Sequence, residues 1–199
     1  MRMRVLTKKV SVRVGLIGQL DPKGWEVVLL QAAAAARRQA QAPYSHFLVG
    51  AAVLSPRGRI YSGCNVERVS YTQTTHAEQN AVDSMVVQEG PTVAEAVAVV
   101  AAHENNCVGN LASPSEPYAE TVRRVRRLTL PEVPVPCGHC LQIIWENCNG
   151  RRDTPLIMVT GEFYPYVFLT TIGDALTMPF GPEALGISYG SGPSGRRDT

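Results

Sequence analysis

Two short stretches of the sequence carry side chains that can hold a metal ion and move a proton. The first, THAEQNAV, places His76 and Glu78 two residues apart, and the second, PCGHC, places Cys137 and Cys140 three residues apart. Two thiolates and one imidazole form the mixed sulfur and nitrogen set that suits Zn²⁺. Three protein ligands leave one tetrahedral position open for a water molecule, as in catalytic zinc sites.

Both stretches lie where the sequence predicts that a helix begins. An apolar-rich helix is predicted over 76–88, and another over 137–147, which Pro136 introduces well. The spacing of Cys137 and Cys140 puts both sulfurs on one face of a first helical turn. The free N–H groups of a helix N-terminus also favour thiolate over thiol.

Glu78 lies too close to His76 in the chain to be a fourth ligand from the same turn. A carboxylate at this position can instead take a proton from the water at the open position and pass it to a substrate. The pattern H-x-E followed by P-C-x-x-C is the signature of zinc-dependent deaminases of nucleobases. The residue types therefore indicate a hydrolytic site with Glu78 as its catalytic group.

The C-x-x-C pair alone also fits a redox dithiol or a structural zinc knuckle. Finding H-A-E at one helix start and P-C-G-x-C at another is more specific than either half and favours the catalytic site. His46, His103 and His139 have no such partner pattern, and we expect them to be surface or internally satisfied residues. A structural site would need a fourth ligand, for which the available residues are Cys64, Cys107, Cys148, His103 and His139.

The composition is that of an ordinary globular protein. The chain has 199 residues, 45% of them hydrophobic, and a formal net charge of +2, which does not indicate binding to nucleic acid or a membrane. No apolar run is long enough to span a bilayer or to form a signal-peptide core. Five cysteines, an odd number, fit a reduced protein of the cytoplasm better than a disulfide framework.

The apolar pattern predicts an α/β protein with a layered sheet. A helix is expected over 25–41, and the polar segment 103–134, with four prolines, is expected to be irregular. The continuous apolar run 96–102 is typical of a central strand that is covered on both faces. The other strands are predicted at 48–54, 59–65, 155–160 and 164–170.

Both ends of the chain differ in composition from its middle. We expect an N-terminal extension over 1–22, a catalytic domain over 23–188 with an insertion at about 103–134, and a flexible tail over 189–199. The extension carries five basic residues and no acid before Asp21, so it fits a targeting segment, whereas VSVRV within it alternates like a strand. The pentapeptide GRRDT occurs twice, and we have no physical account of it.

Three further stretches resemble the cytidine deaminase family. These are PYSHFLVGAAV (43–53), SGCNVERVSY (62–71) and FGPEALG (180–186), and with the two zinc motifs they follow the family's order from about residue 25 to 187. The resemblance implies a three-layer α/β/α fold around a mixed five-stranded sheet. It also implies a homo-oligomer, a dimer or a tetramer, in which neighbouring subunits complete each active site.

The resemblance also assigns residues to the nucleoside. Phe47 is similar to the aromatic residue that packs on the pyrimidine ring, and Ala77 stands where the family offers its backbone to the base. Asn65 and Glu67 resemble the pair that holds the ribose hydroxyls. An amide and a carboxylate suit a hydroxyl group that donates and accepts at once. Glu78 would carry the proton to the ring nitrogen N3 and then to the leaving ammonia.

Two more aromatic residues, Tyr71 and Phe180, resemble those that one subunit donates to its neighbour's site. The chain also departs from the family pattern. Leu141 stands where an arginine often follows the second cysteine, and Val69 replaces a smaller residue near the sugar-binding pair. The insertion at 103–134 is absent from compact members. These departures bear on the substrate more than on the reaction.

The function predicted from these residues is zinc-dependent hydrolytic deamination of cytidine and deoxycytidine in pyrimidine salvage. A modified cytosine nucleoside is an alternative substrate, and a deoxycytidylate is disfavoured because its phosphate would meet the charge of Glu67. A non-catalytic zinc protein is a further alternative. Nucleic-acid deamination is the least favoured, because VRRVRR (122–127) packs four arginines together but has no interleaved aromatic residues for base stacking.

Overall fold

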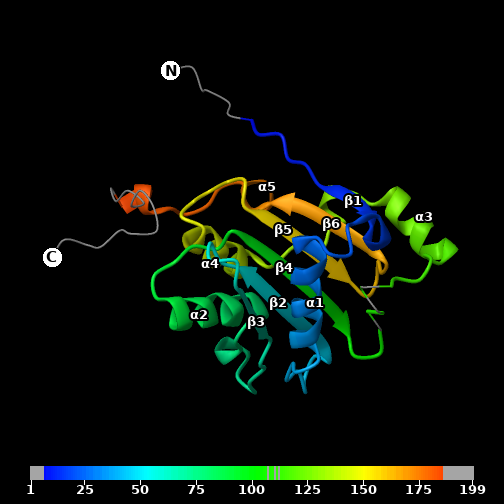
Figure 1. Cartoon of the computed structure of the whole chain (residues 1–199), viewed down its shortest axis with the longest axis horizontal. Helices are drawn as coiled ribbons and strands as arrows, with labels where there is room; N and C mark the ends of the chain where they lie inside the picture. Colours follow the sequence, from blue (N-terminus) through cyan, green and yellow to red (C-terminus); the bar gives the residue numbers. More distant parts are fainter. Residues whose placement is uncertain (1–6, 107, 110, 112, 186–199) are drawn as a thin grey trace.

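A mixed six-stranded sheet forms the centre of the computed structural model, which describes residues 7–106, 108–109, 111 and 113–185 (Figure 1). The strand order is β1-β6-β5-β4-β2-β3, and only β4 and β5 run parallel to each other. The α/β class is confirmed, with one strand more than expected. The strands are β1 (Arg13–Leu16), β2 (Phe47–Leu54), β3 (Ile60–Cys64), β4 (Ala96–His103), β5 (Pro155–Thr160) and β6 (Tyr166–Thr171).

The additional strand is β1, which comes from the basic N-terminal segment. It pairs antiparallel with β6, from Arg13 opposite Leu169 to Leu16 opposite Tyr166. The segment was predicted to be either a targeting segment or a strand. The structure contains a strand in it, and this strand lies at the edge of the sheet. The division into extension, catalytic domain and tail stays a prediction, and residues 189–199 lie outside the described residues.

Helices cover both faces of the sheet, which gives the three layers that were predicted. One helix, α1, packs on one face, while α2 and α4 pack together on the other (Figure 1). In the part of the chain that the structure describes, none of the helices has the length and apolar character needed to cross a membrane. Their bounds are α1 (Trp25–Arg37), α2 (Ala77–Glu89), α3 (Ala119–Arg127), α4 (Gly138–Asn147) and α5 (Ile172–Ala175).

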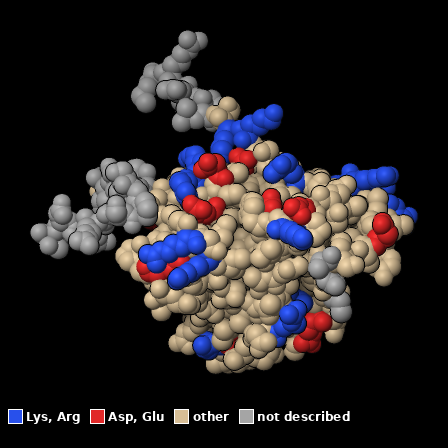
Figure 2. Space-filling model, in the orientation of Figure 1, with Lys and Arg blue, Asp and Glu red and all other residues tan. Residues whose placement is uncertain are grey.

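The expectation that the insertion is irregular was wrong for α3. Its arginines are good helix formers, and Val125 packs against the core below the helix. Arg124 lies over the Phe163 ring, 5.0 Å from its centroid, and pairs with Glu162, so α3 is tied to the turn between β5 and β6. Figure 2 shows basic side chains at the α3 end with acidic ones beside them.

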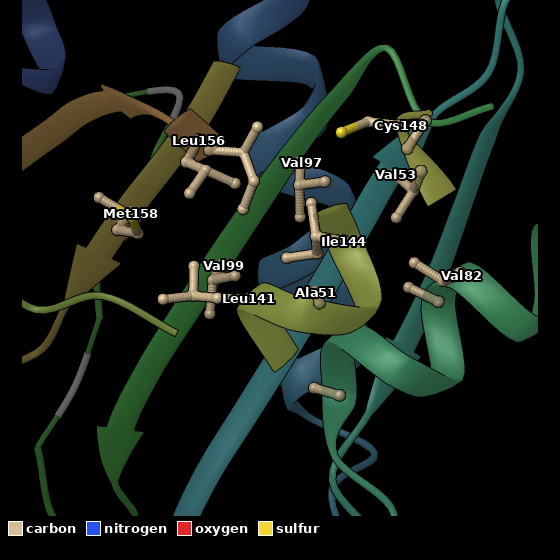
Figure 3. Packing of buried hydrophobic residues seen from close by; sticks show 14 of the residues in the cluster. Ala51, Val53, Val82, Val97, Val99, Leu141, Ile144, Cys148, Leu156 and Met158 are labelled. Carbon is tan, nitrogen blue, oxygen red and sulfur yellow. The ribbon is translucent and has the colours of Figure 1, made fainter. Parts of the chain in front are cut away.

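Alternate side chains of the central strands serve the two cores of the protein. Val97 and Val99 of β4 face α2 and α4, whereas Ala98 and Val100 face α1. This alternation is the period of two that a strand imposes on its side chains. Figure 3 shows the core beneath α2 and α4, where Ile144 of α4 lies over the sheet near Val97.

The first helix ends at Arg37, four residues before the predicted end at 41. The Arg37 side chain donates hydrogen bonds from Nε to Leu48 O (3.0 Å) and from Nη2 to Ala102 O (2.9 Å). The chain then leaves the helix, and Gln41 forms a β-bridge with Val66. The bridge brings the loop before β2 beside the residues that follow β3.

The start of α2 rests directly on Gly63 in β3. A Cβ atom at Gly63 would lie 2.5 Å from Ala81 N and 2.8 Å from Ala77 O, closer than such atoms approach each other. Only glycine therefore allows the helix this close to the sheet. Because His76 and Glu78 stand at the start of α2, this contact sets their height above the strands.

Replacing Gly63 with valine is expected to lift the start of α2 from the sheet. The overpacking should lower the free energy of unfolding by about 1–3 kcal/mol and reduce the zinc bound per chain. Thermal unfolding and metal analysis of the purified protein measure both effects. Ser62→Val is the control, because Ser62 is exposed on the other face of β3. Equal melting temperatures for the two variants would contradict the tight seat at Gly63.

Candidate metal centre and active site

The three residues predicted to bind zinc come together where α2 and α4 begin. His76 is the N-cap residue of α2, and Cys137 is the N-cap residue of α4. His76 Nδ1 lies 3.3 Å from Cys140 Sγ and 3.5 Å from Cys137 Sγ. The three donor atoms all lie within 4.8 Å of one another. This is the separation that three ligands around one ion require.

The electrostatics of the cluster favour a bound cation. Cys140 is completely buried, and burial raises the pKa of its thiol, which the negative charges of Glu78 and Cys137 raise further. A buried thiol beside a carboxylate keeps its proton unless a positive charge compensates. Two helix N-termini contribute part of that charge, and Zn²⁺ would supply the rest. The donor set and its surroundings thus fit zinc.

Among the residues that the structure describes, the donor group consists of the three predicted ligands, without a fourth histidine or cysteine. The donor group contains none of Cys64, Cys148, His103 and His139, whereas Cys107 lies outside the described residues. His139 is exposed and packs its ring edge-on against His76, with centroids 5.4 Å apart. A three-ligand set agrees with a catalytic site better than with a four-ligand structural one.

Glu78 lies in the first turn of α2 and opens onto the same cavity as the metal donors. Only 5% of its surface is exposed. The cavity has a volume of about 440 Å³, and His76, Ala77, Glu78 and Cys137 are among the residues that line it. A carboxylate in this position can exchange protons with a water molecule and with a ligand in the cavity.

Three more of the predicted residues line the same cavity. They are Phe47, Asn65 and Glu67. Of the eight residues assigned to one subunit's own site, seven therefore line this cavity, and the eighth, Cys140, is completely buried. Asn65 Oδ1 accepts a hydrogen bond from Val49 N–H (2.8 Å), and its Nδ2 donates to Phe47 O (2.9 Å). Asn65 therefore also fixes the start of β2.

Glu67 is a buried carboxylate, 6% exposed. Its Oε2 accepts hydrogen bonds from the backbone N–H groups of Tyr44 (3.0 Å) and Ser45 (3.2 Å), and its Oε1 accepts one from the Ser45 hydroxyl. Burial by itself would raise the pKa of Glu67, but these hydrogen bonds and the nearby His46 together lower it. The group is thus held in place as an anion.

Tyr71 and Phe180, predicted to serve a neighbouring subunit, do not line this cavity. They are 62% and 60% exposed. The Tyr71 ring packs edge-on against Tyr44, with centroids 6.0 Å apart. The backbone of Phe180 is held at two points by Gln142, whose Nε2 donates to Phe180 O (2.6 Å) and whose Oε1 accepts from Phe180 N–H (3.2 Å). Both aromatic side chains face outward from the single chain.

The other histidines are exposed, as expected. His46 has a positive φ of 56° and places its Nδ1 3.2 Å from Glu104 Oε1. His103 packs its ring edge-on against Phe47, with centroids 5.1 Å apart. The strand register explains this contact, since Phe47 and His103 are opposite each other on β2 and β4. His103 thus supports the ring of Phe47 from outside the cavity.

Several cavity residues were missed by the sequence analysis. Pro134 and Val135, at the end of the insertion and just after it, form one wall, and their closeness to Cys137 in the chain is a signal that could have found them. Thr160 lines the cavity from the end of β5, which only the strand register reveals. Ser45 stands two residues before Phe47 in the motif PYSHF, and its hydroxyl group was overlooked.

Comparison with known proteins agrees with this site. Residues 23–151, which include His76, Glu78, Cys137 and Cys140, match the family model of the cytidine and deoxycytidylate deaminase zinc-binding region. The chain is 35% identical over 151 residues to a cytidine deaminase of Sporosarcina psychrophila, which covers 75% of this chain and 87% of the relative. It is 32% identical over 146 residues to that of Mycobacterium tuberculosis, covering 73% and 82%.

Solved structures give the same result. The crystal structure of cytidine deaminase from Burkholderia pseudomallei is similar with a TM-score of 0.55 and 30% identity, over 77% of this chain and 97% of that one. The enzyme from Mycobacterium tuberculosis gives a TM-score of 0.51 and 29% identity, over 77% and 95%. From the matched zinc-binding region, the relatives and the donor geometry together, the chain belongs to the cytidine and deoxycytidylate deaminase family.

Proposed function

We propose that this protein is a zinc-dependent enzyme that deaminates cytidine and deoxycytidine by hydrolysis, giving uridine or deoxyuridine and ammonia. The observation that carries the proposal is one cavity lined by metal donors, by the Glu78 carboxylate, and by Asn65 and Glu67. The relatives named cytidine deaminase support it. Zinc, when bound, supplies the Lewis acidity that makes water nucleophilic near neutral pH.

The protein's own groups move the protons in this reaction. Glu78 takes a proton from the attacking water and gives it to N3 of the ring, which prepares C4 for the addition. The same carboxylate then takes the second proton of that water, from the oxygen now bonded to C4, and delivers it to the amino group, which leaves as ammonia. Burial of Glu78 in the cavity wall keeps it within reach of all three positions and away from bulk water.

The remaining residues are proposed to bind the nucleoside. The Phe47 ring packs on the pyrimidine, and the backbone of Ala77, on the first turn of α2, meets the polar edge of the base. Asn65 and Glu67 hold the sugar hydroxyls, for which Glu67 as an anion is a strong acceptor. These roles place the base beside the metal donors and the sugar toward the loop before β2.

We propose further that the protein is a homo-oligomer, a dimer or a tetramer, in which Tyr71 and Phe180 enter the site of a neighbour. Their exposure on the single chain supports this arrangement. A role in pyrimidine salvage in the cytoplasm follows from the proposed reaction. The free state of Cys64, Cys137, Cys140 and Cys148 agrees with that reducing compartment.

Glu78→Gln is expected to abolish turnover while leaving the metal in place. The amide cannot accept the proton, so kcat for cytidine should fall by about 10²–10⁴-fold, a typical contribution of general acid–base catalysis. Loss of cytidine absorbance measures the rate, and elemental analysis measures the zinc. Glu116→Gln, at an exposed position in the insertion, is the control. A zinc-loaded wild-type protein that leaves cytidine unchanged would refute the proposed function.

Cys137→Ser is expected to weaken metal binding. A hydroxyl group is a poorer zinc ligand than a thiolate, so the zinc retained after dialysis against a chelator should drop well below that of the wild type, and activity should drop with it. Cys64→Ser is the matched control, because Cys64 lies at the end of β3 and outside the donor group. Equal zinc retention in both variants would mean that Cys137 is not a ligand.

Shared active sites predict complementation between two inactive variants. A Glu78→Gln subunit still donates Phe180, and a Phe180→Ala subunit still has Glu78. Oligomers mixed after denaturation and refolding should therefore contain sites with both groups and recover activity above the sum of the separate variants. Mixed oligomers without such recovery, detected by native mass spectrometry, would contradict the sharing of Phe180.

A further inference from the structure

The hydroxyl group of Ser45 connects residues that are proposed to bind the nucleoside. It donates a hydrogen bond to Glu67 Oε1 and accepts one from Phe47 N–H (3.1 Å). The backbone N–H of Ser45 also donates to Glu67 Oε2 (3.2 Å). Both carboxylate oxygens of Glu67 are thus bound by one residue, which fixes the plane of the carboxylate as well as its position.

The same hydroxyl group belongs to a longer chain of hydrogen bonds. Phe47 is held at its N–H by Ser45 and at its carbonyl oxygen by Asn65 Nδ2 (2.9 Å). Asn65 Oδ1 in turn accepts from Val49 N–H (2.8 Å). Glu67, Ser45, Phe47 and Asn65 therefore form one connected network, and all four residues line the cavity.

The loop 43–46, which carries Ser45, is not part of any helix or strand. Ser45 is exposed, and His46, which follows it, has a left-handed backbone conformation. A hydrogen bond between a hydroxyl group and a carboxylate is stronger than one between neutral groups. The bond from Ser45 to Glu67 is therefore well placed to hold the loop and the carboxylate in one arrangement.

We propose that Ser45 is a positioning residue that orients the Glu67 carboxylate toward the hydroxyl groups of the nucleoside sugar. The proposal rests on the proposed function, and it adds a residue to which that function assigns no role. Ser45 acts through Glu67 in binding the sugar, and through Phe47 in placing the ring that packs on the base. It takes no part in the proton transfers at Glu78.

A comparison of two substrates separates this role from general damage to the loop. Cytidine has the 2′- and 3′-hydroxyl groups, which Glu67 is proposed to bind, and 2′,3′-dideoxycytidine lacks these two groups. Removing the Ser45 hydroxyl group should therefore harm cytidine through Glu67, while the dideoxynucleoside has no such contact to lose. Any effect through Phe47 acts on the base and should be equal for the two substrates.

The test measures kcat and KM of the wild type and of Ser45→Ala for both nucleosides. For Ser45→Ala, kcat/KM for cytidine should fall by about tenfold more than for dideoxycytidine, the size expected for losing a hydrogen bond to a charged group. The loss should appear mainly in KM. Ser45→Thr, which keeps a hydroxyl group, should restore most of the preference for cytidine.

Three further results decide between the possibilities. Equal losses for the two nucleosides, with a lower melting temperature, would assign Ser45 a purely structural role and overturn the proposal. If Ser45→Ala does not fold, Ser45→Cys, a weaker donor of similar size, should show the same selective loss, and equal losses there would overturn it too. A wild-type protein that deaminates neither nucleoside would overturn the proposed function, and the Ser45 proposal with it.

Discussion

The meeting of two helix N-termini is the constraint on which the rest of this structure depends. His76 and Cys137, two of the three predicted ligands, are the N-cap residues of α2 and α4, so the backbone of each is fixed by the start of a helix. Neither N-cap side chain bonds to its own helix, which leaves both side chains available to a metal ion. The seat of α2 on Gly63 and the packing of Ile144 beneath α4 fix these two starts relative to the sheet.

The groups proposed to hold the sugar are positioned in another way. The groups proposed to hold the sugar are fixed by hydrogen bonds between loops and strand ends. The bridge between Gln41 and Val66 joins the loop before β2 to the segment after β3. Side-chain hydrogen bonds from Ser45 to Glu67 and from Asn65 to Phe47 O add to this connection. The positions of the metal donors thus depend on helix packing, whereas those of the groups proposed to hold the sugar depend on polar contacts.

This difference explains how much the sequence predicted. The clustering of the three predicted ligands and the helices that carry them were predictable because the spacing within each motif is local. The strands β2, β4 and β5 followed from continuous apolar runs. Ser45 and Thr160 were missed because their places depend on tertiary contacts and strand register. The helix α3 was missed because its apolar face is narrow, and the helix is held by the packing of Val125 on the core and of Arg124 on Phe163 rather than by a strong local pattern.

The segment 103–134, which was predicted to be an insertion, has a structural consequence for the cavity. Arg124 anchors α3 to Glu162 and Phe163 in the turn after β5, and the chain that leaves α3 runs on to Pro134 and Val135 in the cavity wall. Two residues later it supplies Cys137. The segment that shapes this wall therefore also sets the direction from which α4 begins, so the cavity wall and the position of a zinc ligand are coupled through the same few residues.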